Sequence, residues 1–127
     1  MFVGTVTNWV SVVGQNIPFA TELNTNNTIK NTGGLIRLKR GGYWNVDVSL
    51  TLTGVADDVI VSLFADGEEK VTTYAEATVT AAGFTTVSLT DAIRTVLSDN
   101  FDFANIAIRV DTAGVTVNGK IRVEYVQ

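Results

Sequence analysis

Apolar and polar side chains alternate almost without interruption through residues 43–53. Polar residues separate five apolar ones, which are Trp44, Val46, Val48, Leu50 and Leu52. Successive side chains of a strand point to opposite faces, so this period of two predicts a strand with one face in a core and the other in water. Such half-buried strands are typical of antiparallel sheets. The stretch therefore predicts a long strand of an antiparallel sheet.

Short apolar segments bounded by Gly, Asn or Asp recur along the rest of the chain. Eighteen Thr and nineteen Val residues add a bias toward β-branched side chains, which favour strands. The polar stretch over residues 22–34 predicts a surface loop around a short strand. We expect strands near residues 3–13, 17–23, 34–40, 43–53, 58–65, 69–79, 83–90, 104–111, 114–118 and 119–126. These short strands predict an all-β sandwich or barrel.

Two dipeptides predict tight turns between neighbouring strands. Asp66-Gly67 lies between VIVSLFA and EEKVTTY, and Asn118-Gly119 lies between GVTV and KIRVEYV. Residues of these types readily adopt the positive φ angles of two-residue hairpin turns. We therefore expect a β-hairpin at each position.

One segment, LTDAIRTVLSDNFDF, departs from the strand pattern. Ile93, Val96 and Leu97 have the spacing of one helical face, and Thr90 or Asp91 could cap a first turn. The spacing predicts one short helix near residues 91–98.

The composition excludes several classes of protein. The 127 residues suit a single domain, and the absence of Cys and His removes thiolate and imidazole metal ligands and the commonest catalytic base. A net charge of −4 without a basic stripe argues against a nucleic-acid partner. No run of 18 apolar residues is present, so we do not expect a membrane span.

Several acidic residues are candidates for chemistry. Paired carboxylates can cleave glycosidic bonds, but pairs such as Asp57-Asp58 lie where turns are expected, and Asp in turns is explained by hydrogen bonds to its own backbone. Asp99, Asn100 and Asp102 are candidate calcium ligands, although they lack the spacing and the Gly of an EF-hand loop. Apart from these calcium candidates we predict no metal site, no cofactor and no catalytic residue, and we do not expect an enzyme.

The aromatic residues fall into two groups. Trp44, Phe64 and Phe84 fit inward positions of strands and are predicted to lie in the core. Exposed aromatic side chains often mark contacts between subunits. The candidates for such a subunit interface are Tyr43, Tyr74, Phe101, Phe103 and Tyr125.

The order of these features along the chain carries a resemblance. Gly41-Gly42-Tyr43 enters the long alternating strand, an apolar strand and a tight hairpin follow over Val59 to Gly67, and GKIRVEYV closes the chain. Together with the opening IPFATELNTNN, this order resembles the C1q/tumour-necrosis-factor-like jelly-roll family in its bacterial and phage form. The resemblance covers about residues 17–126. The segment SLTDAIRTVLSDNFDF departs from the family pattern, in which a Gly-Asp turn often leads into an extended strand.

The resemblance implies a ten-stranded jelly-roll sandwich that assembles as a compact homotrimer. We expect a single domain over residues 1–127, with residues 1–16 as an N-terminal arm or first strand and residues 17–126 as the sandwich. The start Met and the lack of a Gly-X-Y stalk favour a free-standing unit.

The short relatives in this family point to a structural protein of a bacteriophage. The expected role is capsid decoration or part of a surface spike, with the major capsid protein or another virion protein as partner. Such a protein would be made in the cytoplasm of the bacterial host and lie on the capsid surface of the virion, with no nucleic acid or membrane partner. The alternative is a receptor- or carbohydrate-binding module of a phage tail or bacterial surface. That alternative predicts a glycan partner at a shallow loop site with Asn, Asp and an aromatic residue.

Overall fold

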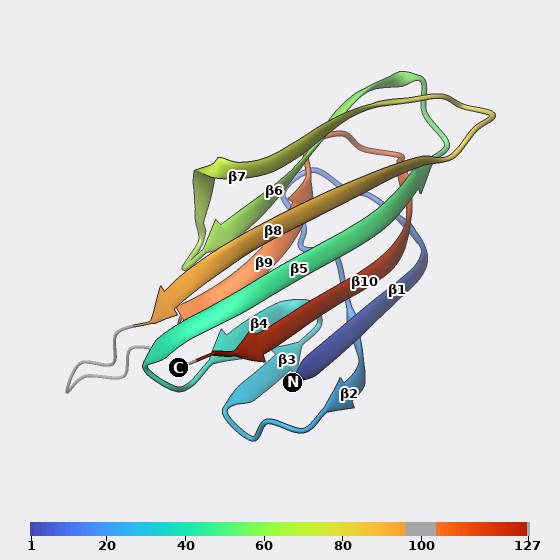
Figure 1. Cartoon of the computed structure of the whole chain (residues 1–127). Coiled ribbons are helices and arrows are strands. Elements are labelled where there is room, and N and C mark those ends of the chain that lie inside the picture. Colours follow the sequence, from blue (N-terminus) through green and yellow to red (C-terminus); the bar gives the residue numbers. More distant parts are fainter. Residues whose placement is uncertain (96–103, 127) are drawn as a thin grey trace.

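The computed structural model describes residues 1–95 and 104–126, except for the side chains of residues 71 and 72. The predicted all-β class is confirmed (Figure 1). Within the described residues there is no helix, and hence none long and apolar enough to cross a membrane. The strands are β1 (Phe2–Val10), β2 (Ala20–Asn24), β3 (Ile29–Thr32), β4 (Leu35–Leu38), β5 (Gly42–Thr53), β6 (Asp57–Ala65), β7 (Glu68–Val79), β8 (Thr85–Thr95), β9 (Ala104–Val110) and β10 (Thr116–Tyr125).

The strands form two antiparallel sheets that pack face to face as a jelly-roll sandwich. Sheet A has the order β2-β1-β10-β5-β8, and sheet B has the order β3-β4-β9-β6-β7. Figure 1 shows β8, β5, β10 and β1 side by side in one layer, with β7, β6 and β9 in the layer behind. Because β1 lies between β2 and β10, the first ten residues are an integral part of sheet A.

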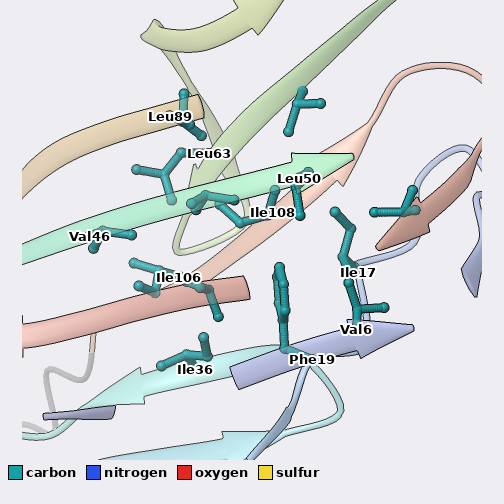
Figure 2. Packing of buried hydrophobic residues seen from close by; sticks show 14 of the residues in the cluster. Val6, Ile17, Phe19, Ile36, Val46, Leu50, Leu63, Leu89, Ile106 and Ile108 are labelled. Atoms are coloured by element: carbon teal, nitrogen blue, oxygen red, sulfur yellow. The ribbon is translucent and has the colours of Figure 1, made fainter. Parts of the chain in front are cut away.

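The core lies between the two sheets and is built from the alternating apolar positions of the strands. Every second residue of β5, from Trp44 to Leu52, is buried, while Asn45, Asp47 and Ser49 are exposed on the opposite face. Figure 2 shows apolar side chains of both sheets, among them those of β5 and β9, directed toward one another. This facing confirms the prediction made from the alternation through residues 43–53.

The hairpin predicted at Asp66-Gly67 is present between β6 and β7. Ala65 pairs with Glu68, and both turn residues have positive φ, 52° for Asp66 and 83° for Gly67. Two consecutive positive φ angles are the signature of the two-residue turn whose twist matches that of the flanking strands.

The hairpin predicted at Asn118-Gly119 is wrong, because β10 runs straight through both residues. Gly119 has a φ of 152°, and a Cβ atom placed there would lie 2.1 Å from the backbone oxygen of Ser49. The backbone N–H of Asn8, beside a register shift in β1, donates to Oδ1 of Asn118 at 2.9 Å. The dipeptide therefore accommodates a bulge in the neighbouring strand rather than a turn.

The helix predicted from residue 91 is also wrong over residues 91–95, where β8 continues. Strand β8 pairs with β5 without interruption from Thr85↔Leu52 to Thr95↔Gly42. The open edge of β5 offers a hydrogen-bonding partner at every step, and this pairing outweighs the helical spacing of a few apolar residues. The remainder of the predicted helix lies outside the described residues.

Candidate assembly and binding surfaces

The structure describes three of the five residues predicted to lie at a subunit interface. Tyr43 and Tyr74 are 51% and 54% exposed, on β5 and β7 respectively, and are available for contact with another subunit. Phe101 and Phe103 lie outside the described residues. The calcium candidates Asp99, Asn100 and Asp102 lie outside the described residues as well, and the described part of the chain holds no cluster of three or more acidic residues that could bind a metal.

Tyr125, the third of these residues, is engaged within the subunit. Its ring packs edge-on against Trp44 at 4.8 Å between centroids, and the guanidinium of Arg40 lies 4.1 Å from its ring centre. Its hydroxyl donates to the carbonyl of Gly41 at 3.0 Å, and Nε1 of Trp44 donates to Oγ1 of Thr95 at 3.1 Å. This cluster ties the start of β5 to the ends of β8 and β10.

Two of the three aromatic residues predicted for the core lie elsewhere. Trp44 is buried, but Phe64 is only partly buried on the outer face of sheet B, and Phe84 is 76% exposed. Strand β8 begins at Thr85, so Phe84 belongs to the loop before it and not to an inward strand position. Leu63 points into the core, and successive side chains of a strand point to opposite faces, so Phe64 points outward.

A polar cluster joins the two sheets at the edge formed by β7 and β8. Asp91 accepts hydrogen bonds from Nζ of Lys70 at 2.8 Å and from Oγ1 of Thr73 at 2.7 Å. Burial acts to raise the pKa of Asp91, but the hydrogen bonds from Lys70 and Thr73, the charge of Lys70 and the N–H of Ala92 outweigh it, so that the pKa is lowered. The carboxylate is therefore stabilised in its charged form and acts as a link between sheets.

Four loops at one end of the sandwich form an exposed apolar surface, which we call the loop end. It comprises residues 10–15, 54–56, 80–84 and 112–115. Within the described residues, it carries four of the eight large apolar side chains that are exposed: Val10, Val12, Val13 and Phe84 at 54%, 46%, 62% and 76%. Small exposed residues complete it, namely Ala56, Ala81, Ala82 and Ala113. In Figure 1 the β5–β6 and β7–β8 loops lie at the end of the sandwich opposite the two chain termini.

Strand register places these loops side by side. Val10 pairs with Thr116, Thr116 pairs with Thr53, and Leu52 pairs with Thr85, the residue after Phe84. Three interstrand spacings of about 4.8 Å put Val10 and Phe84 roughly 14 Å apart across the sheet. The loop end is therefore a continuous row of loops.

Ser11 fastens two of these loops together. Its N–H donates to the carbonyl of Val115 at 2.8 Å, its carbonyl accepts from Gly114 at 2.9 Å, and its hydroxyl donates to the carbonyl of Thr112 at 2.5 Å. The same hydroxyl accepts from the N–H of Val115 at 2.9 Å. Ser11 is 2% exposed, so these bonds hold the apolar side chains on a fixed backbone.

The loop end contains no charged residue, and the charged residues that adjoin its loops in sequence are all acidic: Asp57, Asp58 and Asp111. The loop end thus combines exposed apolar side chains with an absence of charge, a combination that is uncommon on the surface of a monomeric protein. Sequence reasoning missed this surface. The available signal was the run of uncharged, mostly small residues in the segments SVVG, GVA, TAAGF and TAGV, which lie between strands, together with Val10 at the end of β1.

The outer face of sheet A is polar, with charged side chains on β10 and short side chains in the middle of β5 and β8. Short side chains line its two neighbouring strands, namely Ser49 and Thr51 on β5 and Thr86, Ser88 and Thr90 on β8. Short side chains allow two sheet faces or a face and an edge to approach closely.

The outer face of sheet B carries a half-open pocket of about 260 Å³. Strands β6, β7 and β9 form its floor, and the turn at residues 12–15 forms one wall. Its lining residues are Val13, Gly14, Ser62, Phe64, Glu69, Arg109, Val110 and Asp111. The guanidinium of Arg109 lies 4.3 Å from the ring centre of Phe64. The pocket thus combines apolar side chains with one cationic and two anionic groups.

Comparison with known proteins identifies the fold. No family model matches the chain, and no curated protein matches it by sequence. Its structure is similar to the globular domain of the zebrafish complement 1qA protein, with a TM-score of 0.77 and 8% identity over 99% of this chain and 96% of that one. It is similar to murine APRIL, with a TM-score of 0.69 and 10% identity over 95% and 98% of the two chains.

A third similar structure comes from a virus. The vertex protein of phage PRD1 aligns with a TM-score of 0.57 and 10% identity over 94% of this chain and 93% of that one. At such low identities these likenesses concern the fold alone. The chain is a jelly-roll sandwich of the kind found in the C1q and tumour-necrosis-factor domains.

Proposed function

We propose that the protein is a structural component of a bacteriophage particle and assembles as a homotrimer. The likeness to C1q- and tumour-necrosis-factor-like domains supports the trimer, because such domains are typically trimeric. The short side chains in the middle of β5 and β8, on the outer face of sheet A, support close approach of a second subunit there. In this role the protein acts through binding and needs no catalytic residue.

The loop end is the observation that carries the structural role. An apolar, uncharged surface on a fixed backbone suits burial against another protein, since a preorganised surface loses little entropy on binding. The adjoining Asp57, Asp58 and Asp111 favour a partner surface bordered by Lys or Arg. The partner we propose is the major capsid protein or another virion protein.

The likeness to the PRD1 vertex protein supports a place on the virion. The protein would be made in the cytoplasm of the bacterial host and then bind the capsid surface. It would serve there as a decoration protein or as part of a spike, with Phe84 as the largest exposed apolar contact of the loop end.

The oligomeric state is tested by native mass spectrometry at micromolar concentration. A trimer has a mass of three times 13.6 kDa. A species of that mass is expected, and a strictly monomeric protein would contradict the trimer.

Binding to the particle is tested by sedimenting undecorated capsids with the purified protein. Phe84→Ser should weaken co-sedimentation roughly 30-fold, because buried aromatic contacts commonly contribute about 2 kcal/mol or more. Leu23→Ser, which removes an apolar side chain that is 43% exposed on β2, is the matched control and should bind as the wild type does. Failure of the wild-type protein to co-sediment would refute decoration, whereas equal binding by both variants would refute the role of the loop end.

A second candidate function is carbohydrate recognition on a phage tail or bacterial surface. The observation that favours it is the pocket on sheet B, where Phe64 and Asp111 lie together and Asn16 contacts Arg109. This function does not conflict with trimer formation through sheet A, because the strands that line the pocket belong to sheet B.

A further inference from the structure

The pocket on the outer face of sheet B holds an arginine whose position is fixed by two contacts. Nε of Arg109 donates to Oδ1 of Asn16 at 2.9 Å, and Asn16 also forms an isolated β-bridge with Arg109. The guanidinium lies 4.3 Å from the ring centre of Phe64. Within residues 1–95 and 104–126 it makes no ion pair, so its terminal N–H groups can donate to a ligand.

Two carboxylates line the same pocket. Oδ1 of Asp111 accepts from the N–H of Ile60 and from Oγ1 of Thr112, both at 2.9 Å, which fixes its orientation. Its second oxygen has no hydrogen-bond partner in the described part of the chain, and neither does the carboxylate of Glu69. Glu69 is held opposite Phe64 by the pairing of β7 with β6. The pocket therefore offers strong acceptors beside a strong donor.

The remaining lining groups are apolar or weakly polar. Val13, Val110 and the ring of Phe64 provide apolar surface, and the hydroxyl of Ser62 can both donate and accept. Ser62 is 4% exposed although it is on the outer face, so it lies at the bottom of the pocket and not on its rim.

This donor and acceptor set selects among classes of ligand. An anion would be repelled by both Glu69 and Asp111. A cation would be attracted by the two carboxylates but repelled by Arg109 at the position where the pocket donates hydrogen bonds. A neutral ring with several hydroxyl groups avoids either repulsion, because a hydroxyl can accept from the guanidinium and donate to a carboxylate. The C–H face of such a ring can pack on the apolar side chains. A volume of about 260 Å³ limits the ligand to about one ring.

We infer that this pocket binds a neutral polyhydroxylated ring, such as a hexose or an inositol, through Arg109, Glu69 and Asp111. This inference rests on the second candidate function above and names its ligand class and binding residues. A half-open site for a ligand of about twelve heavy atoms predicts a Kd of the order of 1 mM.

The test is a titration of the isotope-labelled full chain, followed by amide NMR shifts. The probes are methyl glucoside, methyl galactoside, N-acetylglucosamine and myo-inositol, with glucuronate and glucosamine as the charged counterparts. We expect at least one neutral probe to shift the amides of Ser62, Glu69 and Asp111, and to bind at least several-fold more tightly than the charged ones.

Two variants on the same face of β7 provide the matched comparison. Glu69→Gln should weaken binding of the neutral probe roughly tenfold, because a hydrogen bond to a charged acceptor is lost. Glu76→Gln, on the same face but outside the pocket, should change the affinity less than twofold. Arg109→Lys keeps the charge but removes the planar fork, and should also weaken binding.

Each contrary result has a distinct meaning. Tighter binding of glucuronate or glucosamine at the same amides would overturn the neutral class and leave carbohydrate recognition standing. If no probe shifts any amide at a concentration 50-fold above the expected Kd, both the neutral ligand class and carbohydrate recognition would be overturned. Binding that is unchanged in Glu69→Gln and Arg109→Lys would place the ligand elsewhere and overturn the assignment of the pocket.

Discussion

At the scale of single residues, the two faces of β5 impose opposite requirements on neighbouring positions. Val48 is 3% exposed within the core, whereas Ser49, the next residue, is exposed on the outer face of sheet A. A charge is tolerated at the second position because water solvates it, but at the first it would be buried without a partner.

Val48→Asp should therefore destabilise the protein by roughly 4 kcal/mol or more, a large fraction of the roughly 5–15 kcal/mol that stabilises a typical domain. Ser49→Asp introduces the same charge one residue away and should change the free energy of unfolding by about 0.5 kcal/mol or less. Urea unfolding followed by tryptophan fluorescence measures both. A wild-type midpoint for Val48→Asp would refute the inward facing of this residue.

Gly119 provides a second prediction at this scale. In Gly119→Asn the new Cβ would collide with the backbone oxygen of Ser49, which cannot move without breaking sheet A, so we expect a loss of roughly 3 kcal/mol. Gly67→Asn is the control, because no atom lies within 4 Å of its Cβ position and Asn tolerates the conformation of a hairpin turn. Equal unfolding midpoints for the two variants would contradict the close approach of β10 and β5.

At the scale of strands, the sequence predicts those elements whose own residues alternate. The bounds expected for the strands near residues 43–53, 58–65 and 104–111 agree with β5, β6 and β9 to within about one residue. The errors fall where a neighbouring strand decides the local structure. Asn118 hydrogen-bonds to the bulge in β1 and does not form a turn, and residues 91–95 pair with the edge of β5 and do not form a helix. The local sequence does not reveal which strand will lie beside either segment.

The candidate surfaces were harder to predict than the strands for a related reason. Arg109 and Phe64 are distant in sequence and meet only because β9 pairs with β6. Likewise, the apolar loops are separate segments until register places them at one end of the sandwich. Phe84 is the clearest example. It lies one position before β8, and the sequence alone does not distinguish this loop position from an inward position of the strand.

The link between β7 and β8 carries a prediction at the same scale. The pKa of Asp91 is lowered from 3.8, so its ion pair with Lys70 stabilises the fold fully above the unfolded pKa and is lost as the pH falls through the lower, folded value. Asp91→Asn should therefore be less stable than the wild type at pH 7, and this difference should shrink below about pH 4. Urea unfolding between pH 2.5 and 7 tests this, with Asp47→Asn on the exposed face of β5 as the control. A difference that is constant with pH would exclude the ion pair as the cause.

At the scale of the whole molecule, both chain ends lie at the end of the sandwich opposite the loop end (Figure 1). Phe2 pairs with Val123, so the two ends are neighbours in sheet A. A molecule that docks through the loop end would therefore present both termini away from its partner.

This arrangement predicts that the chain tolerates circular permutation. A linker of about six Gly and Ser residues joining the two ends, with new ends between Gly67 and Glu68, should leave the fold intact. Both residues are exposed, no atom lies within 4 Å of the Cβ position of Gly67, and the cut spares the hydrogen bonds between Asp66 and Asn105. A permutant opened between Asn45 and Val46, which pair on both sides, should fail to fold. Circular dichroism and thermal unfolding distinguish the two. An unfolded first permutant would contradict the proximity of the ends.

The central place of β10 in sheet A also determines when the protein can fold. This strand follows the nine other described strands in the sequence, yet it separates β1 from β5 and pairs with both along nearly its full length. Until the ribosome has delivered it, two earlier strands have unpaired inner edges and the core cannot close. Sheet A can therefore close only after β10 has been synthesised and has inserted between β1 and β5. The long sequence separation of these pairs predicts refolding in milliseconds to seconds. During that time the unfolded chain exposes its apolar strands and is most prone to aggregation.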